Sequence, residues 1–262
     1  MSWNEFPFIA IPACLLWLAA GLLACRRAQT RRTVWLVDAL AIGGIVLFAL
    51  FIGSFWNALS RPPLRTMGET RLWYALFLTL VGYVTYRRWH YPWLLLLSAV
   101  AATAFTAINI LKPEIHSIAL MPALQSFLFI PHVIIYIIAY ALFGVATLAA
   151  AALLVQRRKN AVNQELFAFV DNLVYIGFGF LALGLLLGAF WAKEAWGHYW
   201  TWDPKETLAF ITGAAYLAYI HLRLQGRQDS LVIWALPIAF ALLLLSWFGT
   251  TLFPGSSLHL YS

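Results

Sequence analysis

The residues best suited to chemistry lie at positions 191–207, which read WAKEAWGHYWTWDPKET. This tryptophan-rich segment contains five aromatic rings and two flanking cations: Trp191, Trp196, Tyr199, Trp200, Trp202, Lys193 and Lys205. Aromatic faces stack on flat apolar molecules, cations pair with acidic groups, and Gly197 permits a close approach of the backbone. The segment therefore predicts a binding site for a planar, apolar dianion such as haem, although a quinone or a lipid headgroup would use part of it.

Part of the same segment has a purely structural interpretation. Asp203, Pro204 and Glu206 match the N-cap, the first position and the capping-box glutamate of a helix start. Single tryptophans at a membrane surface are also explained by the aromatic belts found at both interfaces. The density of rings, five within twelve residues, is what favours a ligand over an anchor.

Histidines are the second group with chemical potential, because imidazole is the commonest axial ligand of haem iron. His132 follows Pro131 at the start of an apolar span, and His259 lies in the short tail after the last span. We expect this pair to ligate iron, with His198 inside the tryptophan-rich segment as an alternative ligand. His116 is expected on the same side, and each of these histidines taken alone is explained as an ordinary interfacial residue.

His221 differs from these because it lies deep in a predicted span, about 22 Å from the outer end of that span. Ionisable residues at such depth usually face a protein interior or a transport pathway. The neighbouring Arg223 and Arg227 instead place it near the inner interface, where its ring could contact water at little cost in free energy. The sequence leaves both interpretations open, and His221 stays a candidate haem contact.

The composition determines the class of protein that holds these residues. Of 262 residues, 63% are hydrophobic and 10% charged, with a mean hydropathy of +0.81, so we expect a polytopic membrane protein built only from helices. The net charge of +7 comes from basic residues between apolar spans, which excludes nucleic acid as a partner. No CxxC or CxxCH occurs, so the chain is neither a dithiol oxidoreductase nor a carrier of its own covalent haem.

Eight apolar stretches are long enough to cross a bilayer, and we expect residues 1–262 to form one membrane domain. The predicted spans are 7–25, 34–56, 70–86, 91–111, 127–155, 169–192, 205–224 and 231–251. Eleven of the seventeen Lys and Arg residues fall in one set of alternate connections. By the positive-inside rule that set is cytoplasmic, so both termini and the tryptophan-rich segment are predicted outside the cytoplasm.

The motif WGxYWxWDPKET resembles the tryptophan-rich WWD signature of haem-handling membrane proteins of cytochrome c maturation. Its DPKET ending is similar to the CcsA (also called ResC) branch of the System II machinery. Two further segments resemble that family: residues 120–126 (LMPALQS) with His132 and Val133, and residues 258–261 (LHLY). Glu69, near the third span, resembles a glutamate of the family. Lys193 and His198 depart from the small or neutral polar residues expected there, which keeps His198 as an alternative ligand.

The resemblance implies a haem-handling subunit of a cytochrome c synthase, also called a haem lyase, that holds haem b as substrate. His132 and His259 would be its axial ligands at the outer face, and His221 would touch haem inside the membrane. The family joins haem to the CxxCH thiols of apocytochrome c together with a CcsB- or ResB-type partner, also called Ccs1. The implied location is a bacterial inner (plasma) membrane or a thylakoid-type membrane, with the active site on the extracytoplasmic face.

Two other functions are compatible with the same residues. One is a haem exporter or delivery subunit that makes no thioether bond. The other is a structural or quinone-binding subunit of a membrane complex, which would use the tryptophan-rich segment as an anchor.

Overall fold

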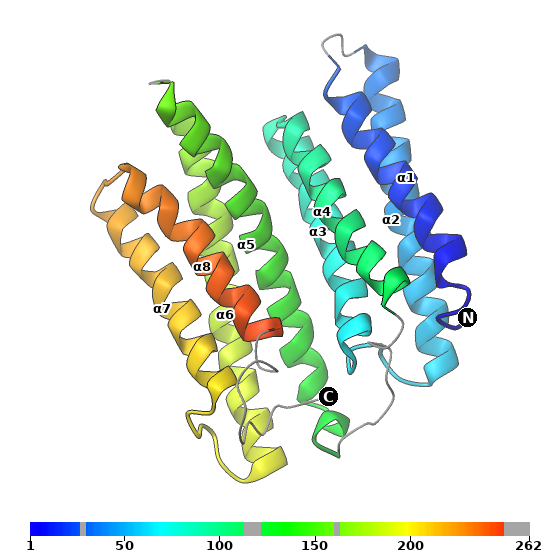
Figure 1. Cartoon of the computed structure of the whole chain (residues 1–262), viewed down its shortest axis with the longest axis vertical. Coiled ribbons are helices and arrows are strands. Elements are labelled where there is room, and N and C mark those ends of the chain that lie inside the picture. The colour runs from blue at the N-terminus through cyan, green and yellow to red at the C-terminus, as the bar shows by residue number, and fades with distance from the viewer. Residues whose placement is uncertain (27–29, 113–121, 160–162, 249–262) are drawn as a thin grey trace. The chain divides into compact units, whose positions relative to one another are not determined.

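The structure, a computed structural model, describes residues 1–26, 30–112, 122–159 and 163–248. All regular elements in these ranges are helical (Figure 1): α1 (Phe6–Ala24), α2 (Arg31–Leu59), α3 (Met67–Trp89), α4 (Pro92–Leu111), the short 3-10 helix η2 (Pro122–Gln125), α5 (Phe129–Arg158), α6 (Gln164–Trp196), α7 (Pro204–Leu224) and α8 (Ser230–Phe248). The prediction of an all-α protein is confirmed, and each predicted span corresponds to one long helix.

Seven of these helices are long and apolar enough to cross a membrane. The exception within the described ranges is α3, because Glu69 and Arg71 lie in its first turns and Arg87 and Arg88 in its last. The eighth membrane crossing therefore stays a prediction that depends on the apolar middle of α3.

The chain divides into two compact units, Met1–Ala119 and Leu120–Ser262. The first contains α1 to α4, and the second contains η2 and α5 to α8. Most of the predicted site residues, including His132 and the whole tryptophan-rich segment, belong to the second unit. Whether the whole chain acts as one membrane domain stays a prediction.

Aromatic side chains fill the core between α1 and α2 in the first unit. Phe6 of α1 contacts Phe48 and Phe51 of α2, with ring centroids 6.0 and 5.0 Å apart, and all three are fully buried. A polar contact joins α2 to α3, where Asp38 accepts a hydrogen bond from the Tyr83 hydroxyl at 3.0 Å and pairs with Arg87 at 3.3 Å. Packing of apolar rings and one partly exposed polar cluster thus hold these three helices together.

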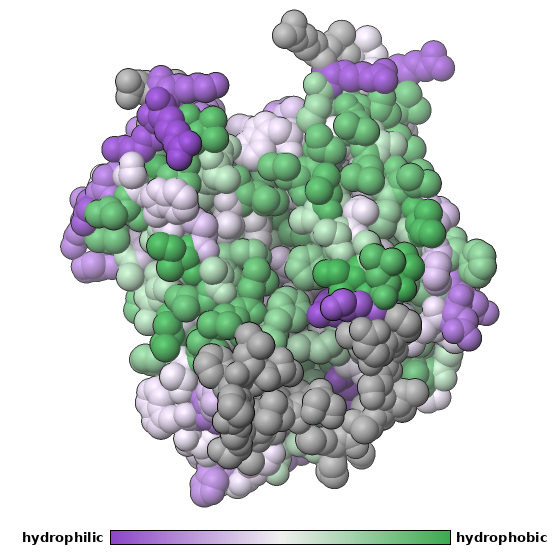
Figure 2. All heavy atoms as spheres, viewed as in Figure 1, coloured by the Kyte–Doolittle hydropathy of each residue, from purple (hydrophilic) through white to green (hydrophobic). Residues whose placement is uncertain are grey.

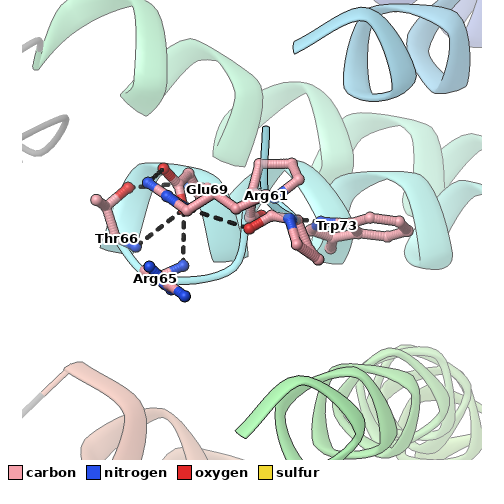
Figure 3. Close-up of polar contacts among 7 residues, drawn as sticks. Arg61, Arg65, Thr66, Glu69 and Trp73 are labelled. Carbon is pink, nitrogen blue, oxygen red and sulfur yellow. Dashed lines mark hydrogen bonds and ion pairs between the residues drawn. The ribbon is translucent and has the colours of Figure 1, made fainter. Parts of the chain in front are cut away.

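The loop between α2 and α3 is organised by one buried carboxylate, that of Glu69 (Figure 3). Both of its oxygens accept hydrogen bonds from Arg61, at 2.8 and 3.0 Å, and one also accepts the backbone N–H of Arg65 at 2.7 Å. With Thr66, Glu69 closes a capping box at the start of α3. Burial and the nearby Arg61 guanidinium lower the pKa of Arg65, and the Glu69 carboxylate opposes this shift. Glu69, which resembles a family glutamate, therefore has a clear structural role in shaping this loop.

The second unit is built on two long antiparallel helices, α5 and α6 (Figure 1). They contain 30 and 33 residues, or about 45 and 50 Å, whereas the hydrocarbon layer is about 30 Å thick. Their ends therefore extend past the apolar layer and can hold a site in water or among headgroups. Figure 2 shows hydrophobic residues along α5 and α8, with hydrophilic residues gathered at the C-terminal end of α5.

A partly buried ion pair joins α6 to α7 at the end opposite the tryptophan-rich segment. Arg223 donates from Nε and Nη2 to the carboxylate of Asp171, at 2.9 and 2.7 Å, and the Tyr219 hydroxyl donates to the same group at 2.8 Å. The Arg223 guanidinium also lies over the ring of Phe167, 4.6 Å from its centroid. Asp171 of α6 therefore joins the two helices through Tyr219 and Arg223 of α7.

Candidate functional site

The tryptophan-rich segment connects α6 to α7, and its non-helical part is shorter than its sequence suggests. Helix α6 continues through Trp196 and ends at Gly197, which takes the left-handed conformation with φ of +83° and donates its N–H to the Lys193 carbonyl. Lys193 in turn donates from Nζ to the Gly197 carbonyl at 2.7 Å and lies 5.4 Å from the centre of the Tyr199 ring. The last turn of α6 and its glycine cap therefore direct the chain into a connection of only residues 197–203.

Two acidic residues fix the other end of this connection. Asp203 accepts the N–H of Glu206 at 2.7 Å, and the Glu206 carboxylate accepts the N–H of Thr201 at 2.7 Å and that of Asp203 at 3.4 Å. Both acids are buried, and the capping box predicted for this helix start is confirmed. Asp203 therefore supports the site by holding the loop in shape. Lys205, the second residue of α7, is half-buried.

Trp202 is held in an unfavourable backbone conformation. Its φ of +59° lies in the left-handed region, which is rare for a bulky side chain and costs on the order of 1 kcal/mol or more. Its indole is 62% exposed, next to the exposed ring of Phe210 with centroids 5.5 Å apart. The loop thus contains a strained residue whose aromatic side chain is exposed.

Trp191 has the opposite role, because it is only 2% exposed. Its indole N–H donates to the carbonyl of Ala123 in η2 at 2.8 Å, and its ring contacts those of Phe129 and Trp196. It also stacks on the imidazole of His132, with centroids 5.5 Å apart and planes 25° apart. Trp191 therefore joins η2, α5 and α6 around His132.

The orientation of His132 is fixed by the backbone of α6. Its Nδ1 lies 2.9 Å from the carbonyl oxygen of Gly184, and since that oxygen only accepts, Nδ1 must carry the proton. In the neutral ring the lone pair is then on Nε2, which is the form that coordinates a metal ion. The edge of Tyr136 contacts the ring from a second direction, with centroids 4.7 Å apart.

Three rings on α5 face three glycines on α6. A Cβ placed on Gly188, Gly184 or Gly177 would come within 2.6, 2.8 or 2.9 Å of the rings of His132, Tyr136 and Phe143, respectively. The spacings of four and seven residues are the same on both helices and run in opposite directions, as antiparallel packing requires. Sequence reasoning missed this seam, and the matching intervals of rings and glycines are the signal that could have revealed it.

The remaining rings of the segment form its outer part. Tyr199 is exposed and contacts the exposed Phe190, with centroids 6.0 Å apart, while Trp200 contacts Trp202 at 5.6 Å. The indole N–H of Trp200 is buried and has no acceptor among the described residues. Exposed aromatic faces and an indole donor without an acceptor fit a flat ligand with acidic groups at its rim, as haem has.

The other histidines are placed differently. His198 is exposed in the connection between α6 and α7. His221 is exposed one turn before the end of α7, where its Nε2 lies 3.0 Å from Nε2 of Gln225. It is 17 residues, or about 25 Å, from the start of α7, so the structure does not bring it to the tryptophan-rich segment. His116 and His259 lie outside the described residues, and the pairing of His132 with His259 stays a prediction.

The chain resembles known proteins of cytochrome c assembly or biogenesis. Residues 64–257 match the family model described as Cytochrome C assembly protein. The chain is 31% identical over 268 residues to the cytochrome c biogenesis protein CcsA of Cuscuta exaltata, an alignment that covers 86% of each chain. It is 32% identical over 279 residues to CcsA of Nicotiana tomentosiformis, with 87% of each chain covered.

A solved structure also resembles this fold. The cytochrome c haem lyase CcmF matches with a TM-score of 0.69 and 22% identity. The match covers 94% of this chain and 46% of that one, so this chain spans less than half of its length. At this identity the likeness concerns the arrangement of helices.

Proposed function

Because the chain belongs to the cytochrome c assembly protein family, we propose that it is the haem-handling membrane subunit of a cytochrome c synthase. In this proposal haem b is the substrate, held beside the tryptophan-rich segment at the extracytoplasmic face. His132 supplies one axial ligand and His259 the other. The protein is an integral membrane protein, and the proposed location is a bacterial plasma membrane or a thylakoid-type membrane.

The observation that carries the proposal is the setting of His132. A histidine at a helix start would ordinarily rotate in water, but this ring is held by the Gly184 carbonyl, the face of Trp191 and the edge of Tyr136. Contacts of this kind are typical of metal-ligating histidines, whose second nitrogen donates to a carbonyl or carboxylate that fixes the tautomer. Three contacts to one imidazole fix its direction before any ligand arrives.

The surrounding residues suit the rest of a haem molecule. The exposed rings of Tyr199 and Trp202 offer surfaces for the macrocycle, and the Trp200 N–H is suited to a propionate oxygen. Lys193 and Lys205 lie at either end of the connection, where they add positive charge. His198 is the alternative ligand.

The proposed reaction is the addition of two cysteine S–H groups of an apocytochrome c CxxCH motif across the two vinyl groups of haem. Each addition forms one C–S bond and moves the thiol hydrogen to the vinyl carbon next to it, so no external oxidant or reductant is needed. The contribution of this chain is to hold the haem edge towards the thiols, since fixed proximity can supply a large part of such a rate enhancement. A CcsB- or ResB-type subunit is the proposed partner, and His221 is proposed to touch haem on its way through the bilayer, together with a histidine of that subunit.

The test of the ligand assignment is the visible spectrum of purified variants. His132→Gly should lose most of the haem absorbance that the wild type retains, and added imidazole should restore part of it by replacing the missing ring. His198→Gly is the matched control and should keep its haem. Retention of haem by His132→Gly together with its loss from His198→Gly would assign the iron to His198 instead.

A second experiment separates synthesis from delivery. The chain is reconstituted with its partner subunit, haem and an apocytochrome c, and haem staining of a denaturing gel detects covalent attachment. Stained cytochrome supports a synthase. Transfer of haem to an acceptor protein without stained cytochrome supports a delivery subunit, and a protein that binds no haem supports the quinone or anchoring function.

A further inference from the structure

A groove with a volume of about 840 Å³ lies between α5 and α8, at the end of the unit opposite the tryptophan-rich segment. It is lined by Ala151, Leu154, Val155, Arg157, Arg158, Ser230 and Trp234. The proposed haem function uses none of these residues. By the predicted topology the groove opens at the cytoplasmic ends of the two helices.

The lining changes in character along the helix axes. Ala151, Leu154 and Val155 of α5 form an apolar wall, and Trp234 of α8, with an indole 47% exposed, faces it from the other side. The polar lining lies at the helix ends, with the two arginines in the last turn of α5 and Ser230 at the first position of α8. Figure 2 shows the same change from hydrophobic to hydrophilic surface towards the end of α5.

The charge at the polar end is positive. Arg157 is held in place by donating from Nη1 to the carbonyl of Gln228 at 2.6 Å, and Arg158 is exposed beside it. The nearby acid Asp229 is already paired with Arg227 at 2.7 Å, so its charge is offset. A fixed guanidinium, an exposed guanidinium and a hydroxyl at one end of an apolar groove are the groups that bind a phosphate ester carrying hydrocarbon chains.

We propose that this groove binds an anionic phospholipid, with the phosphate at Arg157, Arg158 and Ser230 and an acyl chain along Leu154 and Trp234. Phosphate recognition alone would also accept free inorganic phosphate. The apolar wall favours the lipid, because it adds buried hydrocarbon area that a free ion cannot use. A lipid in this position would join the ends of α5 and α8.

The test uses native mass spectrometry of the full chain in detergent. Phosphatidylglycerol, phosphatidylcholine and inorganic phosphate are each added to the wild type and to Arg158→Gln, which changes an exposed side chain and should leave the fold intact. We expect phosphatidylglycerol to remain bound to the wild type and to bind about fivefold more weakly to Arg158→Gln, the effect of one cation near a lipid phosphate. Ser230→Ala is an independent variant in the opposite wall and should also weaken binding.

Lys159→Gln is the matched control, because it removes the adjacent exposed charge without touching the lining of the groove. Equal losses in Arg158→Gln and Lys159→Gln would overturn the proposal, since they would reflect general attraction to positive charge. Equal binding of the two phospholipids by the wild type would overturn it as well. Binding of inorganic phosphate without binding of phosphatidylglycerol would replace the lipid site by a phosphate site.

Discussion

At the scale of single residues, the main feature is that the position of His132 depends on glycines of α6. Gly188 and Gly184 have no Cβ, and that missing atom is what allows the imidazole and the Tyr136 ring to approach α6. The contact between Nδ1 and the Gly184 carbonyl exists only because the two helices come this close. Small residues on one helix therefore decide the chemistry of a side chain on another.

A glycine substitution tests this dependence. In Gly188→Ala the new Cβ would lie 2.6 Å from Cε1 of His132, so the ring must move away from the Gly184 carbonyl. Overpacking of this kind costs about 1–3 kcal/mol. We expect a lower thermal unfolding temperature and less retained haem absorbance, measured on the purified protein in detergent.

Gly179→Ala is the control on the same helix, because a Cβ there meets nothing within 4 Å. It gains the same helix propensity, about 0.5–1 kcal/mol, without a clash. If the two variants unfold at the same temperature and hold the same amount of haem, the close approach at Gly188 has no part in placing His132.

At the scale of helices, α6 and α7 are connected at both ends by different means. At one end the capping box of Asp203 and Glu206 and the glycine cap of α6 shape the short connection. At the other end the Asp171–Arg223 pair joins the helices directly. The connection thus joins two helices that are also held together at their opposite ends by the Asp171–Arg223 pair.

Asp171→Asn should strongly destabilise the protein. The amide keeps the size of the side chain but removes the charge that faces Arg223, whose side chain is only 9% exposed. Breaking a fully buried pair from one side typically costs about 3–5 kcal/mol, so this partly buried pair should lose an amount near the lower end of that range, because water can reach the remaining charge in part. Thermal unfolding followed by circular dichroism measures the loss.

The chain offers a matched control in its exposed Asp229–Arg227 pair. Asp229→Asn should leave the unfolding temperature nearly unchanged, since solvent and salt screen an exposed pair. Asparagine also preserves the hydrogen bond that Asp229 accepts from the N–H of Val232. A similar loss of stability in both variants would show that burial does not set the strength of the Asp171 pair.

At the scale of the whole molecule, the proposed function requires a particular orientation in the membrane. The tryptophan-rich segment must face the compartment where cytochromes c acquire haem, and the arginine-rich connections must face the cytoplasm. The distribution of Lys and Arg predicts this orientation, and the ends of the helices carry residues that can report it.

Thiol labelling tests the orientation. Cys25 is exposed just after α1, on the predicted cytoplasmic side, whereas Cys14 is buried. A membrane-impermeant maleimide should label Cys25 in inside-out vesicles and not in right-side-out vesicles. Desolvation raises the pKa of the Cys25 thiol, so only a small fraction is thiolate at neutral pH. Because the thiolate is the reactive form, the labelling rate should increase as pH rises towards that pKa.

The reverse pattern is expected for the other face. Tyr199→Cys in a Cys25→Ser background should react only in right-side-out vesicles, since position 199 is exposed in the tryptophan-rich segment. Labelling of both positions from the same side would contradict the predicted topology and with it the extracytoplasmic site.

The class of protein, the positions of the helices and the family could all be predicted from the order of the residues. Long apolar runs in a chain with few charges leave little alternative to membrane helices, because backbone groups in hydrocarbon must be satisfied within the segment. The capping box at Asp203 could be read for a related reason, since it depends only on residues three positions apart. Helix caps of this kind can therefore be predicted without the tertiary structure.

Which of the candidate residues lie together became clear from the packing of the helices. Trp191 and Trp202 are alike in sequence, yet one is buried against His132 and the other is exposed on a strained backbone. His132 and His221 were both candidates, and only the first lies against the tryptophan-rich segment. The burial of Trp191 against His132 depends on the register of α5 against α6, along which rings pack over glycines more than thirty positions away in the chain.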